Sequence, residues 1–308
     1  MDGIINVYKE KGYTSFDVVA KLRGILKTRK IGHTGTLDPM AEGVLPVCLG
    51  SATKLVDDIT GTSKTYIAEM ILGVSYDTLD TTGELLEKRD VNVSEEEVRQ
   101  AVASFIGEQD QIPPMFSAVK INGVKLYDMA RKGKVVERKP RRITIHSIEV
   151  MDINLNAETP TVRISVECSK GTYIRSLISD IGDKLGTLAA MSELTRTKTG
   201  SFTVDKAYTI DQIEEYFKSG RLGSIISYVD DYFIDFPPLT VKKDEMLYAE
   251  NGNRLLVSSF EEEEELKDRA GGMYRIYSHP EDGIFYGVYS FDSKRGDFKP
   301  ERMFFARR

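Results

Sequence analysis

The sequence predicts a mixed α+β fold arranged in two domains, and three features support this. The chain has 308 residues, which is roughly the length of two average domains. Stretches with helical periodicity alternate with stretches of period-two hydrophobicity through residues 1–235. The segment Phe236-Pro237-Pro238 is typical of a linker, and the short apolar stretches that follow are typical of a β-hairpin. We therefore expect a mixed domain over residues 1–235 and a small β-rich domain over residues 236–308.

The first hundred residues contain two predicted helices and one predicted strand. Ser15 is suited to cap a helix, and the basic turn 27–30 suits the helix's C-terminal end. Residues 32–39 are typical of a loop, and residues 65–72 of a strand that ends at Gly73. Ser94 and Glu97 form a capping box ahead of a second helix. The apolar face expected for the first helix consists of Phe16, Val19, Leu22, Ile25 and Leu26.

The second hundred residues predict a short helix, two strands and a longer helix. Residues 124–132 form the short helix, and residues 143–150 and 162–168 form the strands. Thr172 is suited to cap the longer helix, which runs to Leu185 and stops at Gly186.

Composition excludes several classes of protein. The hydrophobic fraction is 41% and the charged fraction 29%, which is ordinary for a globular protein. No apolar run approaches the roughly 18 residues of a membrane helix, and the N-terminus lacks the pattern of a signal peptide. Cys48 and Cys168 lie in apolar runs, as buried thiols of a reducing compartment do. We expect a cytoplasmic protein with no membrane association and, because its few histidines and cysteines are far apart, no metal site.

Charge is unevenly distributed along the chain. The net charge is −6, yet residues 1–206 hold 28 basic and 28 acidic residues, so the excess lies in the C-terminal third. Residues 118–142 hold nine basic residues against two acidic ones, and a local patch of this kind is typical of a nucleic-acid binder. A solvated basic face is the alternative. The candidate contacts to an RNA backbone are Lys120, Arg131, Lys132, Arg141 and Arg142.

The segment 32–46, GHTGTLDPMAEGVLP, is the most informative in the chain. Gly35 permits unusual backbone angles, and Pro39 restricts Asp38 to an extended conformation. A carboxylate fixed in a rigid loop is a candidate nucleophile or base, although an aspartate that caps a turn would show the same pattern. A phosphate-binding loop is a weaker interpretation, because the sequence lacks both common glycine-rich signatures.

This segment and four others, in the same order, resemble the bacterial tRNA pseudouridine-55 synthases, the TruB family. The others are KTY at 64–66, GVSYDTLD at 73–80, PPMFSAVK with the following GVKLYDMAR at 113–131, and CSKGTYIRSL at 168–177. The resemblance covers residues 5 to about 200. It departs from the family near the N-terminus, where Glu10 replaces a usual proline. It implies a pseudouridine-synthase fold, with a central, mostly antiparallel sheet flanked by helices, and a C-terminal PUA-like RNA-binding domain.

The resemblance also implies roles for individual residues. Asp38 would be the nucleophile, Arg175 its charge partner, and Tyr66 would help to remove the C5 proton of the uracil. His33 would fill space near the flipped base, and Asp80 would hold the hydrogen-bond network. Residues expected to contact the substrate nucleotide are Tyr173, Leu194 and Lys64.

The implied activity is isomerisation of uridine to pseudouridine at position 55 in the T-loop of tRNA, an enzyme reaction that needs no cofactor. A base in a folded loop must leave its stack to enter a pocket, so base flipping is expected. The T-arm of tRNA is the expected partner, and the resemblance implies a monomer that requires no protein partner.

Two other functions remain open, and the five ordered motifs nearly exclude a third. One is a tRNA-binding and folding chaperone that uses the same surface. The second is the archaeal and eukaryotic relative that works in a guide-RNA particle, although this chain lacks long basic tails. The third is a metabolic α/β enzyme with an unusual glycine loop.

Overall fold

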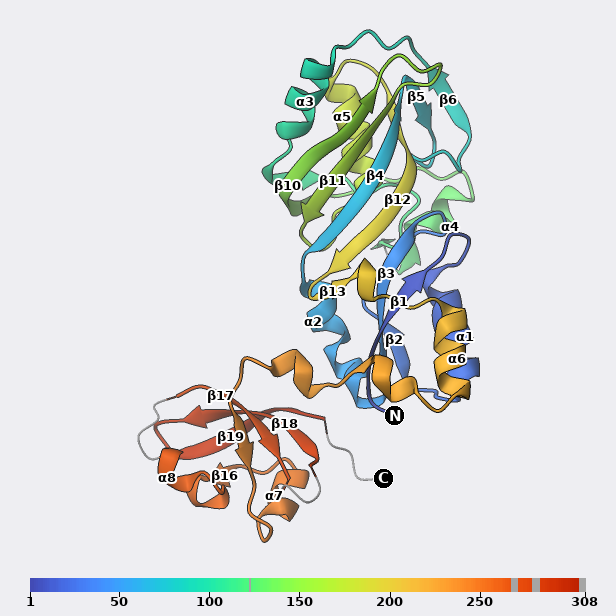
Figure 1. Ribbon diagram of the computed structural model, residues 1–308. Helices are drawn as coiled ribbons and strands as arrows, with labels where there is room; N and C mark the ends of the chain where they lie inside the picture. Colours follow the sequence, from blue (N-terminus) through green and yellow to red (C-terminus); the bar gives the residue numbers. More distant parts are fainter. Residues whose placement is uncertain (122, 267–270, 279–282, 305–308) are drawn as a thin grey trace.

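The chain folds around one long twisted sheet, with a smaller sheet attached at its end (Figure 1). The computed structural model describes residues 1–121, 123–266, 271–278 and 283–304. Among them, no helix is long and apolar enough to cross a bilayer. The large sheet has ten strands, and its neighbours run antiparallel except where β12 meets β3. In spatial order its path is β14 (Ile226–Ser227), β1 (Gly3–Lys9), β3 (Glu42–Leu49), β12 (Ala189–Thr199), β4 (Lys64–Leu72), β11 (Thr161–Cys168), β10 (Arg141–Asn154) and β7 (Gly107–Gln111), with β13 (Phe202–Thr203) beside β12 and β2 (Ile31–His33) beside β3.

Helices cover the two halves of this sheet separately. α3 (Glu95–Ala103) and α5 (Ile174–Lys184) lie behind β10, β11 and β4 in the view of Figure 1. Alternate residues of β4 and β11 face these helices and form one hydrophobic core with Leu177, Ile178 and Ile181. α1 (Ser15–Leu26) and α6 (Ile210–Lys218) pack on β1 and β3 and enclose a second core.

Shorter elements connect these layers. η1 (Gly50–Leu55) and α2 (Val56–Gly61) join β3 to β4, and the hairpin of β5 (Val74–Tyr76) and β6 (Leu85–Lys88) follows β4. Residues 112–140, here called the lobe, connect β7 to β10. The lobe contains β8 (Lys120–Ile121), β9 (Val124–Lys125) and α4 (Leu126–Ala130). Short 3-10 turns η2 (Val204–Lys206), η3 (Leu222–Ile225) and η4 (Asp230–Phe233) lead to the C-terminal part.

The C-terminal part is a five-stranded sheet with its own hydrophobic core. Its order is β15 (Pro238–Thr240), β17 (Met273–Tyr277), β18 (Phe285–Asp292), β19 (Asp297–Met303) and β16 (Leu255–Leu256), with α7 (Met246–Glu250), η5 (Val257–Ser259) and α8 (Glu263–Leu266) alongside. A shared cluster that includes Phe233, Val288 and Phe304 joins it to the main body. Arg302 pairs with Asp58 across this contact and donates to the carbonyl of Lys54 at 2.9 Å.

The predicted mixed α+β architecture, with a mostly antiparallel central sheet, is confirmed. The capping box of Ser94 and Glu97 and the strands at 65–72, 143–150 and 162–168 are present. The hairpin expected after the linker also forms, as β17 and β18, although residues 279–282 of its turn lie outside the described residues.

Several local predictions are wrong in detail. Thr14, rather than Ser15, caps α1, because Thr14 and Asp17 exchange a reciprocal capping box. Phe16 is 64% exposed instead of joining the apolar face. The hydroxyl of Thr172 donates to the carbonyl of Ser169, and Tyr173 stands at the N-cap of α5 without a side-chain cap.

Candidate active site

A cavity of about 270 Å³ opens where the loop after β2, the start of β4, the end of β12 and the N-terminus of α5 meet. The lobe contributes Ser117 and Ala118 to its rim. Six of the sequence-predicted site residues line it, although they come from four separate segments of the chain. These residues are Asp38, Lys64, Tyr66, Tyr173, Arg175 and Leu194.

The loop that carries Asp38 is held from both sides by hydrogen bonds. The hydroxyl of Ser15, at the start of α1, accepts a hydrogen bond of 2.8 Å from the backbone N–H of Leu37. The carbonyl of Pro39 accepts from the N–H of Gly12 at 2.8 Å and from the ammonium of Lys9 at 3.5 Å. Lys9 is fully buried, and burial lowers the pKa of its ammonium to about 8. The loop is therefore fixed by α1 and β1.

Arg175 connects Asp38 to the β5–β6 hairpin. Its guanidinium lies 2.9 Å from the carboxylate of Asp38 and 3.5 Å from that of Asp80. It also donates to the carbonyls of Thr78 and Phe116, at 2.9 and 2.7 Å. Because the arginine side chain is only 5% exposed, these contacts lock its position.

Asp80 is fixed independently of Arg175. One of its carboxylate oxygens accepts from the hydroxyl of Thr78 at 2.9 Å and from the backbone N–H of Thr82 at 3.0 Å. The carboxylate is 5% exposed, so it provides a rigid negative charge behind Arg175. Asp80 therefore lies in a buried hydrogen-bond network beside Arg175.

The carboxylate of Asp38 stays open to the cavity, with 36% of its side chain exposed, while Arg175 behind it is buried. Desolvation raises the pKa of Asp38 above its ordinary value, and Arg175 opposes this rise while Asp80 adds to it. The sequence-based expectation named only the effect of Arg175. Desolvation also makes an ionised carboxylate at this position more reactive, because fewer water molecules stabilise its charge.

Tyr66 and Lys64 lie on the inward face of β4. Burial raises the pKa of the Tyr66 phenol, and Arg196 partly offsets the rise. The ammonium of Lys64 donates to the carbonyls of Thr60 and Thr62, at 2.7 and 2.6 Å. Burial and the charge of Arg196 lower its pKa to about 8. Both groups therefore face the cavity in a strongly desolvated setting.

Arg196 is a cavity residue that the sequence analysis did not assign. It lies on β12, is 1% exposed, and donates to the carbonyls of Val44 and Gly35, at 2.7 and 3.2 Å. Its backbone runs against Gly43, where a Cβ atom would lie 2.2 Å from the carbonyl oxygen of Arg196, so only glycine fits. A signal existed: Arg196 follows Leu194 by two residues and shares its inward face.

Gln111 is a second residue that the sequence analysis missed. Its buried amide exchanges two hydrogen bonds with the backbone of Tyr173, at 2.8 and 3.0 Å. These bonds set the entry of α5 into the cavity. His33, by contrast, is half-buried just outside the cavity lining, and its Nδ1 accepts from the N–H of Gly35 at 3.3 Å. Burial lowers the pKa of the His33 imidazole, so the neutral ring is favoured.

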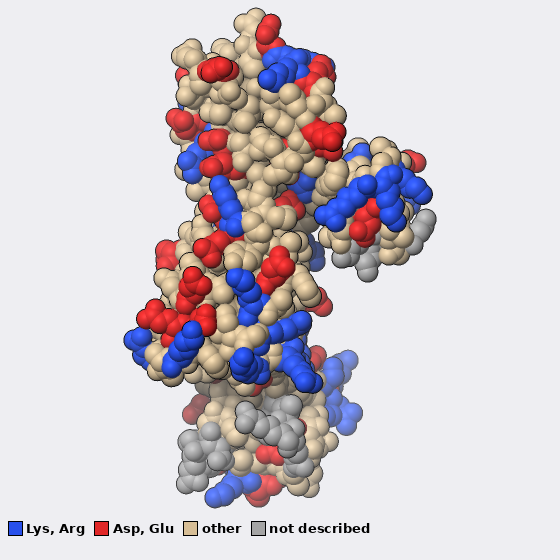
Figure 2. Space-filling view, turned by 90° about the vertical axis from the view of Figure 1, so that its right-hand side faces the viewer, with Lys and Arg blue, Asp and Glu red and all other residues tan. Residues whose placement is uncertain are grey.

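The predicted phosphate contacts lie on the lobe and at the start of β10. Figure 2 shows the lobe projecting from the body with Lys and Arg side chains gathered on it. Arg131 and Lys132 are exposed, and the guanidinium of Arg131 lies 5.5 Å from the ring centre of Tyr127. Lys120 lies on β8, but its side chain is outside the described part of the structure.

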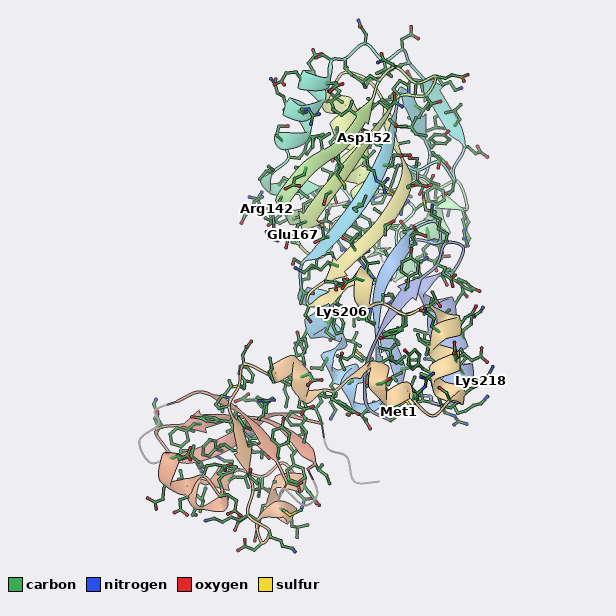
Figure 3. The ribbon with its side chains drawn as sticks, in the orientation of Figure 1. Met1, Arg142, Asp152, Glu167, Lys206 and Lys218 are labelled. Atoms are coloured by element: carbon green, nitrogen blue, oxygen red, sulfur yellow. The ribbon has the colours of Figure 1, made fainter. Side chains whose placement is uncertain are left out.

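The two adjacent arginines of β10 differ in their surroundings. Arg142 extends from the outer edge of the sheet (Figure 3) and pairs with Glu108 at 2.9 Å and Asp110 at 3.7 Å, both on β7. Arg141 is exposed, and no ion pair of Arg141 occurs among the described residues. A phosphate would therefore have to compete for Arg142 but not for Arg141.

Within the described ranges, no group of three or more His, Cys, Asp or Glu side chains is arranged to hold a metal ion. The ionisable groups that line the cavity are one carboxylate, two phenols, two ammonium groups and two guanidinium groups, those of Asp38, Tyr66, Tyr173, Lys64, Lys170, Arg175 and Arg196.

The chain matches two family models in succession. The N-terminal domain of the TruB family pseudouridylate synthases matches residues 23–174, and the tRNA pseudouridylate synthase B C-terminal domain matches residues 175–232. Two solved structures share the fold at a TM-score of 0.68. One is an H/ACA RNP bound to a substrate RNA containing 2′-deoxyuridine, at 26% identity over 99% of this chain and 86% of that one. The other is a Cbf5-Nop10-Gar1 complex, at 28% identity over 99% and 85%.

Bacterial relatives are more similar. The tRNA pseudouridine synthase B of Lachnoclostridium phytofermentans is 48% identical over 99% of this chain and 100% of its own length. That of Clostridium perfringens is 42% identical over 98% of this chain and 99% of its own. Given these identities over nearly complete chains and the two matching models, the chain belongs to the TruB family of pseudouridylate synthases.

Proposed function

We propose that this protein isomerises uridine to pseudouridine at position 55 in the T-loop of tRNA. The observation that carries the proposal is the carboxylate of Asp38, which opens onto the cavity and is paired behind with Arg175 at 2.9 Å. The bacterial relatives named for tRNA are more similar to this chain, at 48% and 42% identity, than the ribonucleoprotein structures at 26% and 28%. That difference favours tRNA over a guide-RNA particle as the setting.

The reaction breaks the bond between ribose C1′ and N1 of uracil and forms one between C1′ and C5. The target nucleotide leaves its stack to enter the cavity. Asp38 attacks C1′ or stabilises the positive charge that develops there, in the way that glycosidase carboxylates do. The freed base turns and rejoins through C5. The proton on C5 then leaves, its bonding pair re-forms the ring double bond, and N1 takes a proton from solvent. Atoms and charge balance without any cofactor.

The other cavity residues have roles that follow from their positions. Tyr66 faces the base and receives the C5 proton, while Leu194 gives the base an apolar contact. Tyr173 and Lys64 contact the nucleotide from α5 and β4, and Asp80 keeps Arg175 in place. His33, a neutral ring at the edge of the cavity, stacks in the space from which the base is flipped.

The exposed basic residues of the lobe, with Arg141, position the RNA through its phosphates, because such contacts orient a nucleic acid without reading its sequence. We further propose that residues 236–308 form a PUA-like domain that holds tRNA outside the catalytic domain at 1–235. The protein acts in the cytoplasm as a monomer and requires neither a cofactor nor a protein partner.

The test is tritium release from C5-labelled uridine in unmodified tRNA. Asp38→Asn keeps the size of the side chain but removes its charge, so turnover should vanish while tRNA binding survives. Asp90→Asn, which removes an exposed carboxylate, is the matched control and should behave as wild type.

Two outcomes would overturn the proposal. If Asp38→Asn forms pseudouridine at nearly the wild-type rate, Asp38 is not the nucleophile. If the wild-type protein binds and refolds tRNA but releases no tritium, the chaperone function is the correct one.

A further inference from the structure

Arg196 and Tyr66 are direct neighbours across two strands. In the antiparallel register of β12 with β4, Arg196 stands opposite Tyr66. Side chains of opposed residues lie on the same face of a sheet with Cβ atoms about 5 Å apart. Both residues line the cavity, and both are almost fully buried, at 1% and 9% exposure.

The charge of Arg196 has no carboxylate partner. Among the described residues, no Asp or Glu oxygen lies within 4.0 Å of its guanidinium, in contrast to Arg175, which has two such partners. Its acceptors with defined geometry are the carbonyls of Val44 and Gly35. A buried charge without an opposite charge destabilises a fold. An unpaired cation beside a catalytic cavity therefore points to an anion that exists only during the reaction.

We propose that Arg196 is a positioning residue that acts through Tyr66, by stabilising the phenolate form of Tyr66 that takes the C5 proton of the rejoined base. The inference rests on the proposed function and adds to it the source of basicity in the site. A neutral phenol cannot accept a proton from carbon, so the step needs an ionised tyrosine. In the step, the phenolate oxygen gains the C5 proton, the C–H pair becomes the C5–C6 double bond, and N1 is protonated by solvent. Tyr66 ends as a neutral phenol, and its proton returns to solvent before the next turnover.

Among the charges around Tyr66, that of Arg196 opposes the effect of burial. Burial raises the pKa of its phenol, and of the groups around it Arg196 lowers that pKa most, while Cys168 and Asp38 act in the opposite direction. Arg196 in turn lowers the pKa values of Lys9, Lys64 and His33, which surround it. The side of the cavity around Arg196, here called the cavity floor, thus has a positive potential. Tyr66 is the phenol that stands directly opposite Arg196.

A matched pair of variants separates the charge of Arg196 from its packing. Arg196→Gln keeps a hydrogen-bond donor without the charge, and Arg196→Lys keeps the charge. Lys198→Met removes an exposed cation from the same strand and serves as the control. The direct readout is the pKa of 3-fluorotyrosine placed at position 66, followed by ¹⁹F NMR in the RNA-free protein.

The pKa at position 66 should rise by about one unit or more in Arg196→Gln, because an opposite charge at this range shifts a pKa by about 1–3 units. It should stay nearer the wild-type value in Arg196→Lys and be unchanged in Lys198→Met. The single-turnover rate of Arg196→Gln should fall about a hundredfold, with a pronounced isotope effect when C5 carries deuterium.

An unchanged pKa at position 66 in Arg196→Gln would overturn the inference. So would an isotope effect near unity, since the lost rate would then lie in the chemistry at C1′. If Arg196→Gln does not fold, Arg196→Lys provides the test. A hundredfold loss of the single-turnover rate in folded Arg196→Lys protein would show that the packing of Arg196, not its charge, matters, and would overturn the inference. Failure of the proposed function is separate, because the wild-type protein would then release no tritium from C5.

Discussion

The cavity floor and the lobe differ in how tightly the fold determines them. On the floor, Arg175 has four protein partners and Arg196 is completely enclosed. The lobe consists of two-residue strands and a five-residue helix, with Leu126 its deepest apolar side chain and Val135 82% exposed. Under the proposed function, this contrast is expected: groups that react must be held rigidly, whereas groups that contact the RNA backbone need only exposure and charge.

The largest effect should come from removing the charge of Arg175. Arg175→Met leaves the carboxylates of Asp38 and Asp80 without their shared cation, so the pKa of Asp38 should rise further. We expect the rate at neutral pH to fall at least about a hundredfold. Unfolding should become easier by about 3 kcal/mol, the lower end of the range for a broken buried pair, because Asp38 is partly exposed. Single-turnover kinetics and denaturant unfolding measure the two effects.

A comparison with Arg175→Lys tests whether Arg175 acts on the charge of Asp38. Lys at position 175 restores a positive charge, so Arg175→Lys should recover part of the loss and shift the acid limb of the pH–rate profile back toward wild type. If Arg175→Met and Arg175→Lys have the same rate and profile, Arg175 does not act on the charge of Asp38.

A moderate effect is expected at the base of the lobe. Replacing Arg141 and Arg142 together by Ala should weaken tRNA binding and leave the single-turnover rate at saturation unchanged. Each neutralised phosphate contributes about 0.7–0.9 to the slope of log affinity against log salt. Because Glu108 and Asp110 already pair with Arg142, we expect the loss of one such contribution, mostly that of Arg141.

The ion pair between Arg142 and Glu108 provides the control for the double alanine variant. Glu108→Gln releases Arg142 from its nearer partner, so tRNA binding should strengthen and the salt slope should steepen. Salt plots of equal height and slope for wild type and the double alanine variant would rule out the two arginines as RNA contacts.

The smallest effect concerns stability and pH. Because the pKa of Asp38 is raised from its ordinary value of 3.8 in the folded state, the folded protein holds the proton more tightly than the unfolded chain. Stability from this group is therefore complete below pH 3.8 and is lost as pH rises through the raised pKa. Asp38→Asn, which cannot ionise, should melt a few degrees above wild type at pH 7, and the gap should close in acid. If Asp38→Asn melts at or below the wild-type temperature at pH 7, the pKa of Asp38 is not raised by folding.

The sequence predicted those features that depend on local pattern. The capping box at Ser94 and the alternation in β11 each suffice to specify their element. The placement of Phe16 failed, because helical spacing identifies a face but not how wide the covered part is. Arg196 was missed for a related reason: a basic residue in a strand is ordinarily exposed, and only the pairing of β12 between β3 and β4 buries it.

The position of β12 also determines when the site can first exist. β3, formed by residues 42–49, finds its neighbour in residues 189–199, and β1 pairs at its other edge with residues 226–227. At about 5–20 residues per second, a ribosome needs roughly 10 to 40 s to reach β12. Until then the loop with Asp38 lacks Arg196, and the pairing of β3 with β12 has not formed. The chain can therefore become active only late in its synthesis, and a truncation before residue 199 should abolish its activity.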